Sequence, residues 1–214
     1  MLPAGVVFDL DGTLVDSRLD LATAVNATRE RLALPPLPVE TIAAMVGEGA
    51  RTLLRRALPE RVAGEAFEVA LALFLDVYFE RCLDATVAYP GIPELLAALA
   101  PRLPLAVLTN KPERHSRRIL DGLGIAAHVG LLVGGDTLPM RKPDPAGLLH
   151  IAARWAASPQ RLLLVGDSDV DVATARSAGT PLALVAWGFG ALDRSAAGAA
   201  WCVDSPAELL AGLR

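Results

Sequence analysis

Short apolar runs recur along the chain, and each is followed by small or polar residues. They occupy residues 6–8, 105–109, 131–134, 162–166 and 182–186. Runs of this length that are apolar throughout are typical of strands buried on both faces of a parallel sheet. Helical patterns begin between the runs, near Pro93, Pro112, Asp144 and Asp169, and a capping box at residues 205–208 opens a last helix. This alternation predicts an α/β fold with a doubly wound, Rossmann-like parallel sheet.

The pattern changes between Asp16 and about Asp84, where strand signals vanish. One helical face there is formed by Leu21, Ala24, Val25, Thr28 and Leu32. Prolines at residues 35–38 end this helix, and a helical stretch at residues 40–58 is broken by Gly-Glu-Gly at residues 47–49. Residues 66–81 are apolar nearly all round, which predicts the buried helix of a small bundle. We therefore expect a core domain of residues 1–16 and 85–214, with an all-helical cap domain of residues 17–84 inserted into it.

Length and composition fit a folded enzyme. A chain of 214 residues can bury one good core plus a smaller module. Its 53% hydrophobic and 21% charged residues exclude a disordered chain. A net charge of −4 and a pI near 5.4 argue against nucleic acid as a partner.

The mean hydropathy of +0.41 raises the question of a membrane. The longest uncharged stretch, residues 177–192, is broken by glycines and a proline and is shorter than the about 20 apolar residues of a span. The first residues carry no basic signal region. Cys82 and Cys202 have no metal-type spacing and suggest no disulfide scaffold. We expect a cytoplasmic protein without a membrane partner, either monomer or homodimer.

The most informative segment directly follows the first apolar run. Residues 9–17 read Asp-Leu-Asp-Gly-Thr-Leu-Val-Asp-Ser. Asp9 and Asp11 would project from the carboxyl end of the strand, where open parallel sheets bind their ligands, and Gly12 permits the turn that brings both into one pocket. Two close carboxylates repel, so the pair requires a cation or a shared proton. The plain alternative is an acidic turn after an edge strand.

Two later segments offer groups for an anion. Thr109 and Asn110 stand between a strand and a helix, and the free backbone N–H groups of a helix N-terminus can hold a phosphate. Alternatively, they only cap that helix. Lys142 precedes another helix, and its ammonium could stabilise a phosphoryl group. The alternative for Lys142 is a solvated surface position.

The last segment is acidic. Residues 167–171 read Asp-Ser-Asp-Val-Asp and follow the apolar run at residues 162–166. Carboxylate oxygens are the ligands that Mg²⁺ prefers. The alternative is that Asp167 or Ser168 caps the next helix, whose first turn favours acidic residues.

Taken together and in this order, the four segments resemble the haloacid dehalogenase (HAD) superfamily of phosphohydrolases. The resemblance runs from Val6 to about Gly179. Finer strings resemble the phosphoglycolate phosphatase group: Thr109-Asn110-Lys111-Pro112, Tyr89-Pro90-Gly91, Lys142-Pro143-Asp144-Pro145 and Gly47-Glu48-Gly49-Ala50.

The resemblance implies a phosphoric monoester hydrolase. In it Asp9 attacks phosphorus and forms an aspartyl phosphate, and Asp11 protonates the leaving oxygen and later deprotonates the hydrolytic water. Thr109, Asn110 and Lys142 would hold the transferring phosphoryl group.

The resemblance also implies Mg²⁺ as cofactor. Its ligands would be Asp9, the backbone carbonyl of Asp11, and Asp167. Asp171 would lie behind them near Lys142, and Asp169 is left without a role.

The helical insert resembles the C1-type cap of this family, which would sit above Asp9 and exclude water. Its loop at residues 47–49 would point at the site, with Arg51 as the best anion-binding residue of the cap. Glu48 would pair with Arg51, turn away, or accept sugar hydroxyls. The alternative is that Arg51, Arg55 and Arg56 form a solvated helix face.

The expected substrate is a small anionic phosphate monoester, with 2-phosphoglycolate first and sugar or amino-sugar phosphates second.

Other protein classes fit the motifs less well. A haloacid dehalogenase usually lacks the second acid of the first motif, here Asp11. A sugar phosphomutase would keep all four motifs, and Thr13 favours hydrolysis. A non-catalytic phosphate-binding regulator would lack a motif residue. The glycine-rich string at residues 122–127 follows a helix, which argues against a dinucleotide site.

Overall fold

The core of the protein is a six-stranded parallel sheet. The computed structural model describes residues 2–189 and 198–213. The strands lie in the order β5-β4-β1-β6-β7-β8, and every neighbouring pair is parallel. Their bounds are β1 Gly5–Phe8, β4 Leu105–Leu108, β5 Leu131–Val133, β6 Leu162–Gly166, β7 Leu182–Val185 and β8 Trp201–Val203. The predicted fold class is confirmed, and β8 is a strand that the apolar runs did not indicate.

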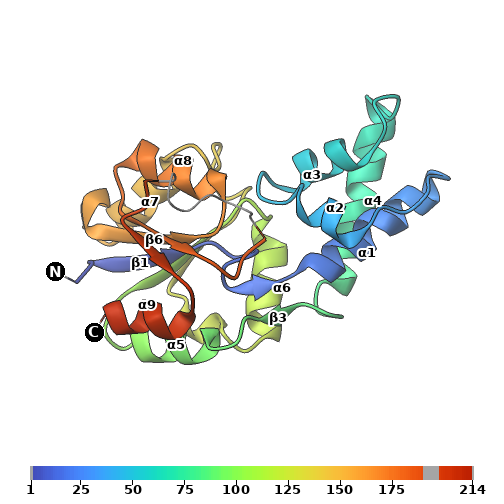
Figure 1. Ribbon diagram of the computed structural model, residues 1–214. Coiled ribbons are helices and arrows are strands. Elements are labelled where there is room, and N and C mark those ends of the chain that lie inside the picture. The colour runs from blue at the N-terminus through green and yellow to red at the C-terminus, as the bar shows by residue number, and fades with distance from the viewer. Residues whose placement is uncertain (1, 190–197, 214) are drawn as a thin grey trace.

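Helices cover both faces of the sheet (Figure 1). On one side lie α7 (Ala146–Arg154) and α8 (Asp169–Ala178), and on the other lie α5 (Ile92–Leu99) and α9 (Pro206–Gly212). Strand residues alternate between the two cores, so Val7 packs with the α7–α8 side while Val6 and Phe8 pack with the other. Two short 3₁₀ turns, η1 (Ala126–His128) and η2 (Pro159–Arg161), precede β5 and β6.

The insert is a separate group of helices beside the core (Figure 1). Its helices are α1 (Arg18–Arg31), α2 (Val39–Ala43), α3 (Ala50–Ala57) and α4 (Glu65–Arg81). The chain enters it through β2 (Val15–Asp16) and returns through β3 (Val87–Ala88), and these two strands pair antiparallel. The predicted all-helical insert is thus present, and we keep residues 17–84 as the proposed cap domain.

Helix α4 has one buried face instead of the predicted burial all round. Phe67, Phe74 and Tyr78 are buried, whereas Val69 is 63% exposed. The reason is that α4 packs against α1 and α3, and its opposite side faces solvent. Its buried face therefore holds the cap together and also reaches the core.

The cap meets the core through α6 (Glu113–Gly122) and the loop before it. The ring of His115 stacks on Tyr78 of the cap at a centroid distance of 5.7 Å, and its Nε2 lies 2.9 Å from the carbonyl oxygen of Leu75. Both chain ends lie at the side of the core remote from the cap (Figure 1). Across residues 2–189 and 198–213, no helix combines the length and the apolar character needed to cross a membrane.

Candidate active site

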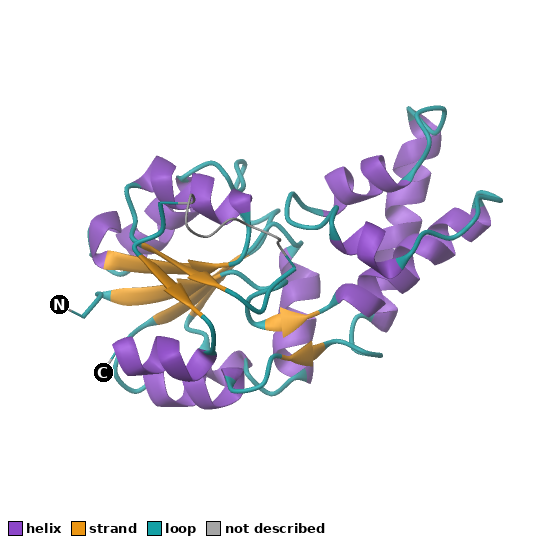
Figure 2. Cartoon of the chain, viewed as in Figure 1, coloured by secondary structure: helices purple, strands orange, loops and turns teal. Residues whose placement is uncertain are grey.

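The carboxyl edge of the sheet faces the cap (Figure 2). Because β1 pairs with both β4 and β6, the residues that follow these three strands meet at one place. Asp9 and Asp11 follow β1, Thr109 and Asn110 follow β4, and Asp167 follows β6. The topology therefore collects the polar segments that are far apart in the sequence.

Three buried carboxylates lie together at this edge. Asp9, Asp167 and Asp171 each offer one oxygen, and these oxygens all lie within 4.8 Å of one another. Lys142 Nζ lies 2.8 Å from Asp9 Oδ1 and donates to Asp171 Oδ1 at 2.7 Å. When all four groups are ionised, three negative charges face one positive charge in a buried space.

Burial and the neighbouring charges shift the pKa values of Asp9 and Lys142. Burial raises the pKa of Asp9 to about 8, and Asp171 and Asp167 push in the same direction while Lys142 opposes them. Burial by itself lowers the pKa of Lys142, but Asp171 and Asp9 outweigh it and hold that pKa above its ordinary value. A divalent cation would balance the two surplus charges, and an all-carboxylate donor set fits a hard cation such as Mg²⁺.

Asp171 is oriented by hydrogen bonds on both of its oxygens. Oδ1 accepts from Lys142, and Oδ2 accepts from Ser168 Oγ at 2.6 Å as part of the capping box of α8. This arrangement fixes the lysine rather than leaving Asp171 open to a ligand. Asp169, the next acidic residue of α8, is exposed.

Asp167 lies between two glycines and is held by hydrogen bonds. Phe189 N donates to Asp167 Oδ2 at 2.8 Å, and Thr13 Oγ1 donates to Oδ1 at 3.3 Å. A Cβ at either Gly12 or Gly188 would lie 2.3 Å from Asp167 Oδ2. The backbone of Gly12 also has φ +83°, which favours glycine.

Asp11 lies beside Asp9 at the mouth of the site. Its Oδ1 accepts hydrogen bonds from Ser17 Oγ and from Lys111 Nζ, the latter at 2.5 Å. The carboxyl group is therefore held in one orientation by two donors from different segments.

Thr109 and Asn110 are buried next to Lys142. Thr109 Oγ1 accepts from the backbone N–H of Lys111 at 3.2 Å. Asn110 Nδ2 donates to the carbonyl oxygens of Lys142 and of Gly47 in the cap, both at 2.9 Å. Asn110 thus ties the cap loop to the segment that carries the lysine.

Lys111 is a site residue to which the sequence analysis assigned no role, although it belongs to the string Thr109-Asn110-Lys111-Pro112. Its ammonium is buried, bonds to Asp11, and donates to Tyr78 Oη of the cap at 2.6 Å. One signal was available: the 20 basic residues include only two lysines, Lys111 and Lys142, and the rest are arginines. Both lysines contact the paired acids of the first motif.

A small cavity separates the core residues from the cap. Asp9, Asp11 and Lys111 line its core side, and its cap side is largely apolar. The apolar wall includes Leu21, Val46, Ala50, Leu53, Phe74 and Leu75. The cavity volume of about 40 Å³ is far below the roughly 300–1,000 Å³ of drug-sized ligand sites. A cavity of this small volume suits a short substrate.

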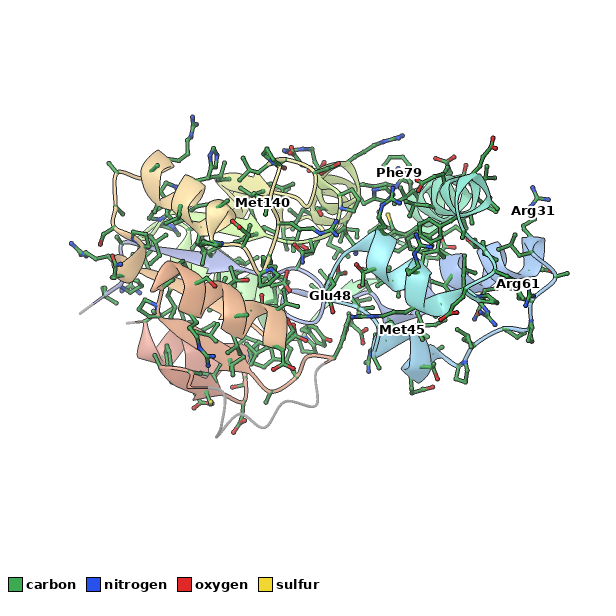
Figure 3. All side chains as sticks on the ribbon, turned by 90° about the horizontal axis from the view of Figure 1, so that it is seen from above. Arg31, Met45, Glu48, Arg61, Phe79 and Met140 are labelled. Atoms are coloured by element: carbon green, nitrogen blue, oxygen red, sulfur yellow. The ribbon has the colours of Figure 1, made fainter. Side chains whose placement is uncertain are left out.

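Arg51 and Glu48 do not lie in this cavity, contrary to the prediction. Arg51 forms a two-fold ion pair with Glu68, with N–O distances of 2.7 and 2.9 Å, and Glu48 pairs with Arg56. All four side chains are substantially exposed. The reason is that α3 begins at Ala50, so the loop before it presents backbone to the core. Glu48 lies at the junction of cap and core in Figure 3. In this structure Arg51, Arg55 and Arg56 lie on an exposed helix face, as the alternative describes.

Comparison with known proteins defines the class. A family model described as haloacid dehalogenase-like hydrolase matches residues 3–179. The chain belongs to this family of hydrolases, as its motifs predicted.

Within this family, the chain is similar to several phosphoglycolate phosphatases. The chain is 46% identical over 209 residues to the phosphoglycolate phosphatase of Chromobacterium violaceum, covering 95% of this chain and 93% of that protein. It is 41% identical over 216 residues to that of Rhodospirillum rubrum, covering 97% and 90%. A solved structure of a predicted phosphoglycolate phosphatase from Haemophilus somnus 129PT superimposes with a TM-score of 0.92 at 31% identity, covering 99% of this chain and 98% of that one. The expected relation to the phosphoglycolate phosphatases is confirmed.

Proposed function

We propose that the protein is a Mg²⁺-dependent phosphate monoester hydrolase that acts on 2-phosphoglycolate through an aspartyl phosphate. The observation that carries this proposal is the buried cluster in which Lys142 Nζ lies 2.8 Å from Asp9 Oδ1, beside two further carboxylates at the carboxyl edge of the sheet. A phosphoryl group bound there would contact both the proposed nucleophile, Asp9, and the ammonium of Lys142, which is held in place.

Asp9 and Asp167 would hold the metal with their carboxylates, and Asp11 with its backbone carbonyl. When bound, Mg²⁺ would supply positive charge to the phosphoryl oxygens. Asp171 would act through Lys142, since hydrogen bonds already occupy both of its oxygens.

In the first step an oxygen of Asp9 attacks phosphorus, the bond from phosphorus to the leaving oxygen breaks, and Asp11 gives its proton to that oxygen. In the second step Asp11 takes a proton from a water molecule, the water oxygen bonds to phosphorus, and the bond to Asp9 breaks. Asp9 returns as a carboxylate and inorganic phosphate leaves.

Thr109, Asn110 and Lys142 would orient the phosphoryl group throughout. All three are buried, so their positions are fixed by packing before substrate arrives. The hydrogen bonds of Ser17 and Lys111 to Asp11 fix the group that transfers protons.

Two observations support 2-phosphoglycolate over a sugar phosphate. The relatives named above bear the name phosphoglycolate phosphatase. The cavity is small and apolar toward the cap, and Glu48, the residue considered for sugar hydroxyls, is engaged by Arg56 outside it. A sugar would bring several hydroxyl groups against side chains that offer them no partner.

Phosphate release from a panel of monoesters tests the substrate. The panel contains 2-phosphoglycolate, hexose phosphates, amino-sugar phosphates and an aryl phosphate. We expect the highest kcat/KM for 2-phosphoglycolate. A sugar phosphate that exceeds it by orders of magnitude would overturn the substrate and leave the phosphatase chemistry standing.

We also propose a cytoplasmic location. Cys82 and Cys202 form no disulfide with each other, which is in keeping with a reducing compartment.

A further inference from the structure

The cavity has one cationic side chain on its wall. Among the described residues that line it, Lys111 alone carries a positive charge. Lys142 is engaged by Asp9 and Asp171, while Arg51 and Arg56 form ion pairs outside the cavity. A substrate with a second anionic group would therefore meet Lys111 first.

We propose that Lys111 binds the carboxylate of the substrate and that Tyr78 positions it for this contact. The inference rests on the proposed function, because it assigns the group that recognises the glycolate part of 2-phosphoglycolate. Lys111 thus takes the place of Arg51 as the residue proposed to recognise the carboxylate of the substrate.

The ammonium of Lys111 has capacity for such a ligand. It carries three N–H donors. One donates to Asp11 Oδ1 at 2.5 Å and one to Tyr78 Oη at 2.6 Å. The third has no hydrogen-bond acceptor in the part of the chain that the structure describes, although the side chain is only 5% exposed. A buried ammonium gains from another acceptor, and a carboxylate supplies both acceptor and charge.

The position of the ammonium matches the chemistry of the substrate. With phosphorus at Asp9, the leaving oxygen lies toward Asp11, which protonates it. Lys111 bonds to that same carboxyl group. In 2-phosphoglycolate the carboxylate is attached one carbon beyond the leaving oxygen, so it falls on the side where Lys111 stands. A longer ester would carry its anionic group past this point.

Tyr78 connects this contact to the cap. It is fully buried on α4, stacks on His115 of α6, and its hydroxyl accepts from Lys111. The cap helix thus fixes the direction of the core lysine. A compact ammonium with three donors can serve Asp11, Tyr78 and a ligand at once, whereas a planar guanidinium fork is built for paired contacts.

A pair of non-hydrolysable mimics tests the assignment. The first is 3-phosphonopropionate, which has a carboxylate, and the second is propylphosphonate, which has a methyl group in its place. Both are measured as competitive inhibitors of aryl phosphate hydrolysis. We expect the wild-type protein to favour 3-phosphonopropionate by about 10- to 100-fold, the range of a charge-assisted hydrogen bond.

In Lys111→Met this preference falls to near unity, while the inhibition constant of propylphosphonate changes by less than about threefold, because its methyl group makes no charge-assisted hydrogen bond. Tyr78→Phe lowers the preference partially. Arg51→Met, which removes an exposed cation, serves as the control and keeps it. Should Lys111→Met turn over too slowly for inhibition kinetics, calorimetric titration of both mimics gives the same ratio, and Lys111→Gln replaces a variant that does not fold.

The outcomes separate this inference from the proposed function. A wild-type protein that hydrolyses no aryl phosphate refutes the phosphatase itself. Hydrolysis without a preference for the carboxylate mimic refutes both 2-phosphoglycolate and the role of Lys111. A preference that survives in Lys111→Met, or an equal loss for both mimics, overturns the role of Lys111 alone, since the lysine would then act only on Asp11.

Discussion

Gly12 packs so closely against Asp167 that a Cβ at Gly12 would lie 2.3 Å from Asp167 Oδ2. The turn of the first motif and the acid of the last are therefore fitted to each other without room for one more carbon atom. The contact joins two segments that lie far apart in the sequence. It helps to hold Asp167, the proposed metal ligand, close to Asp9, the proposed nucleophile.

The first prediction follows from this contact. Gly12→Ala should lower the free energy of unfolding by about 1–3 kcal/mol, because it adds left-handed backbone strain and displaces Asp167. Gly124→Ala is the matched control, since Gly124 has φ +70° and nothing within 4 Å of its added Cβ. Denaturant unfolding of both variants measures the difference. Equal losses in the two variants would show that the contact with Asp167 has no energetic weight.

The second prediction concerns the metal. Mg²⁺ should raise the unfolding temperature of the protein and be required for turnover, because it balances the surplus charge around Asp9. Asp167→Asn should abolish most of the thermal shift. Ca²⁺ should bind but support little activity, since it takes about six to eight ligands at longer distances. Thermal scans and phosphate release, with and without EDTA, measure both effects, and full activity after metal stripping would contradict the account.

The third prediction concerns Asp11. Asp11→Asn should slow alkyl phosphates by about 10²–10⁴-fold, the usual contribution of general acid catalysis. Aryl phosphates should lose less in the phosphorylation step, because their leaving oxygen needs little protonation. Single-turnover rates for the two ester classes give the comparison. The same loss for both, with phosphorylation rate-limiting, would exclude Asp11 as the acid.

The fourth prediction concerns pH and the junction of cap and core. Burial lowers the pKa of His115, so the folded protein favours the neutral ring. The unfolded chain binds a proton as the pH falls below about 6.5, whereas the folded protein binds it only at lower pH. Stability present above pH 6.5 is therefore lost progressively on acidification. His115→Gln should weaken this dependence below about pH 6.5, and His128→Gln is the control variant. Unfolding midpoints at a series of pH values measure this dependence. If the midpoints of wild type and His115→Gln change with pH in the same way, the buried His115 ring does not contribute to it.

Much of the fold could be predicted because its strands are buried on both faces. Val6–Phe8 and Leu162–Gly166 are apolar without interruption, as central parallel strands require. Strand β8 could not be found this way, because Trp201–Val203 is short and Cys202 is exposed at the edge of the sheet. Parallel topology also explains why separate motifs converge, since their strands all end at one edge.

The cap residues were predicted less well for a physical reason. Sequence spacing placed Arg51 near a glycine loop but did not show which side of α3 faces the core. In the structure Arg51 forms an ion pair with Glu68 of the neighbouring helix α4. The ammonium of Lys111 donates a hydrogen bond to Tyr78, which lies on α4 of the inserted helices and is far from Lys111 in the sequence. Contacts of this kind arise only from tertiary packing.

The proposed mechanism depends most on Asp9 as the nucleophile. Asp9→Asn should fold, as judged by circular dichroism, and lose at least about 10³-fold in turnover, because an amide is a poor nucleophile. A residual rate near that of the wild-type protein in the folded variant would contradict covalent catalysis by this residue.

The most direct measurement is acid quench of the wild-type protein during turnover, followed by peptide mass spectrometry. We expect one phosphoryl group on the peptide that contains Asp9, formed at least as fast as phosphate is released and missing in Asp9→Asn. Phosphate release with no phosphorylated peptide on the time scale of a single turnover, or a phosphoryl group on another residue, would contradict it.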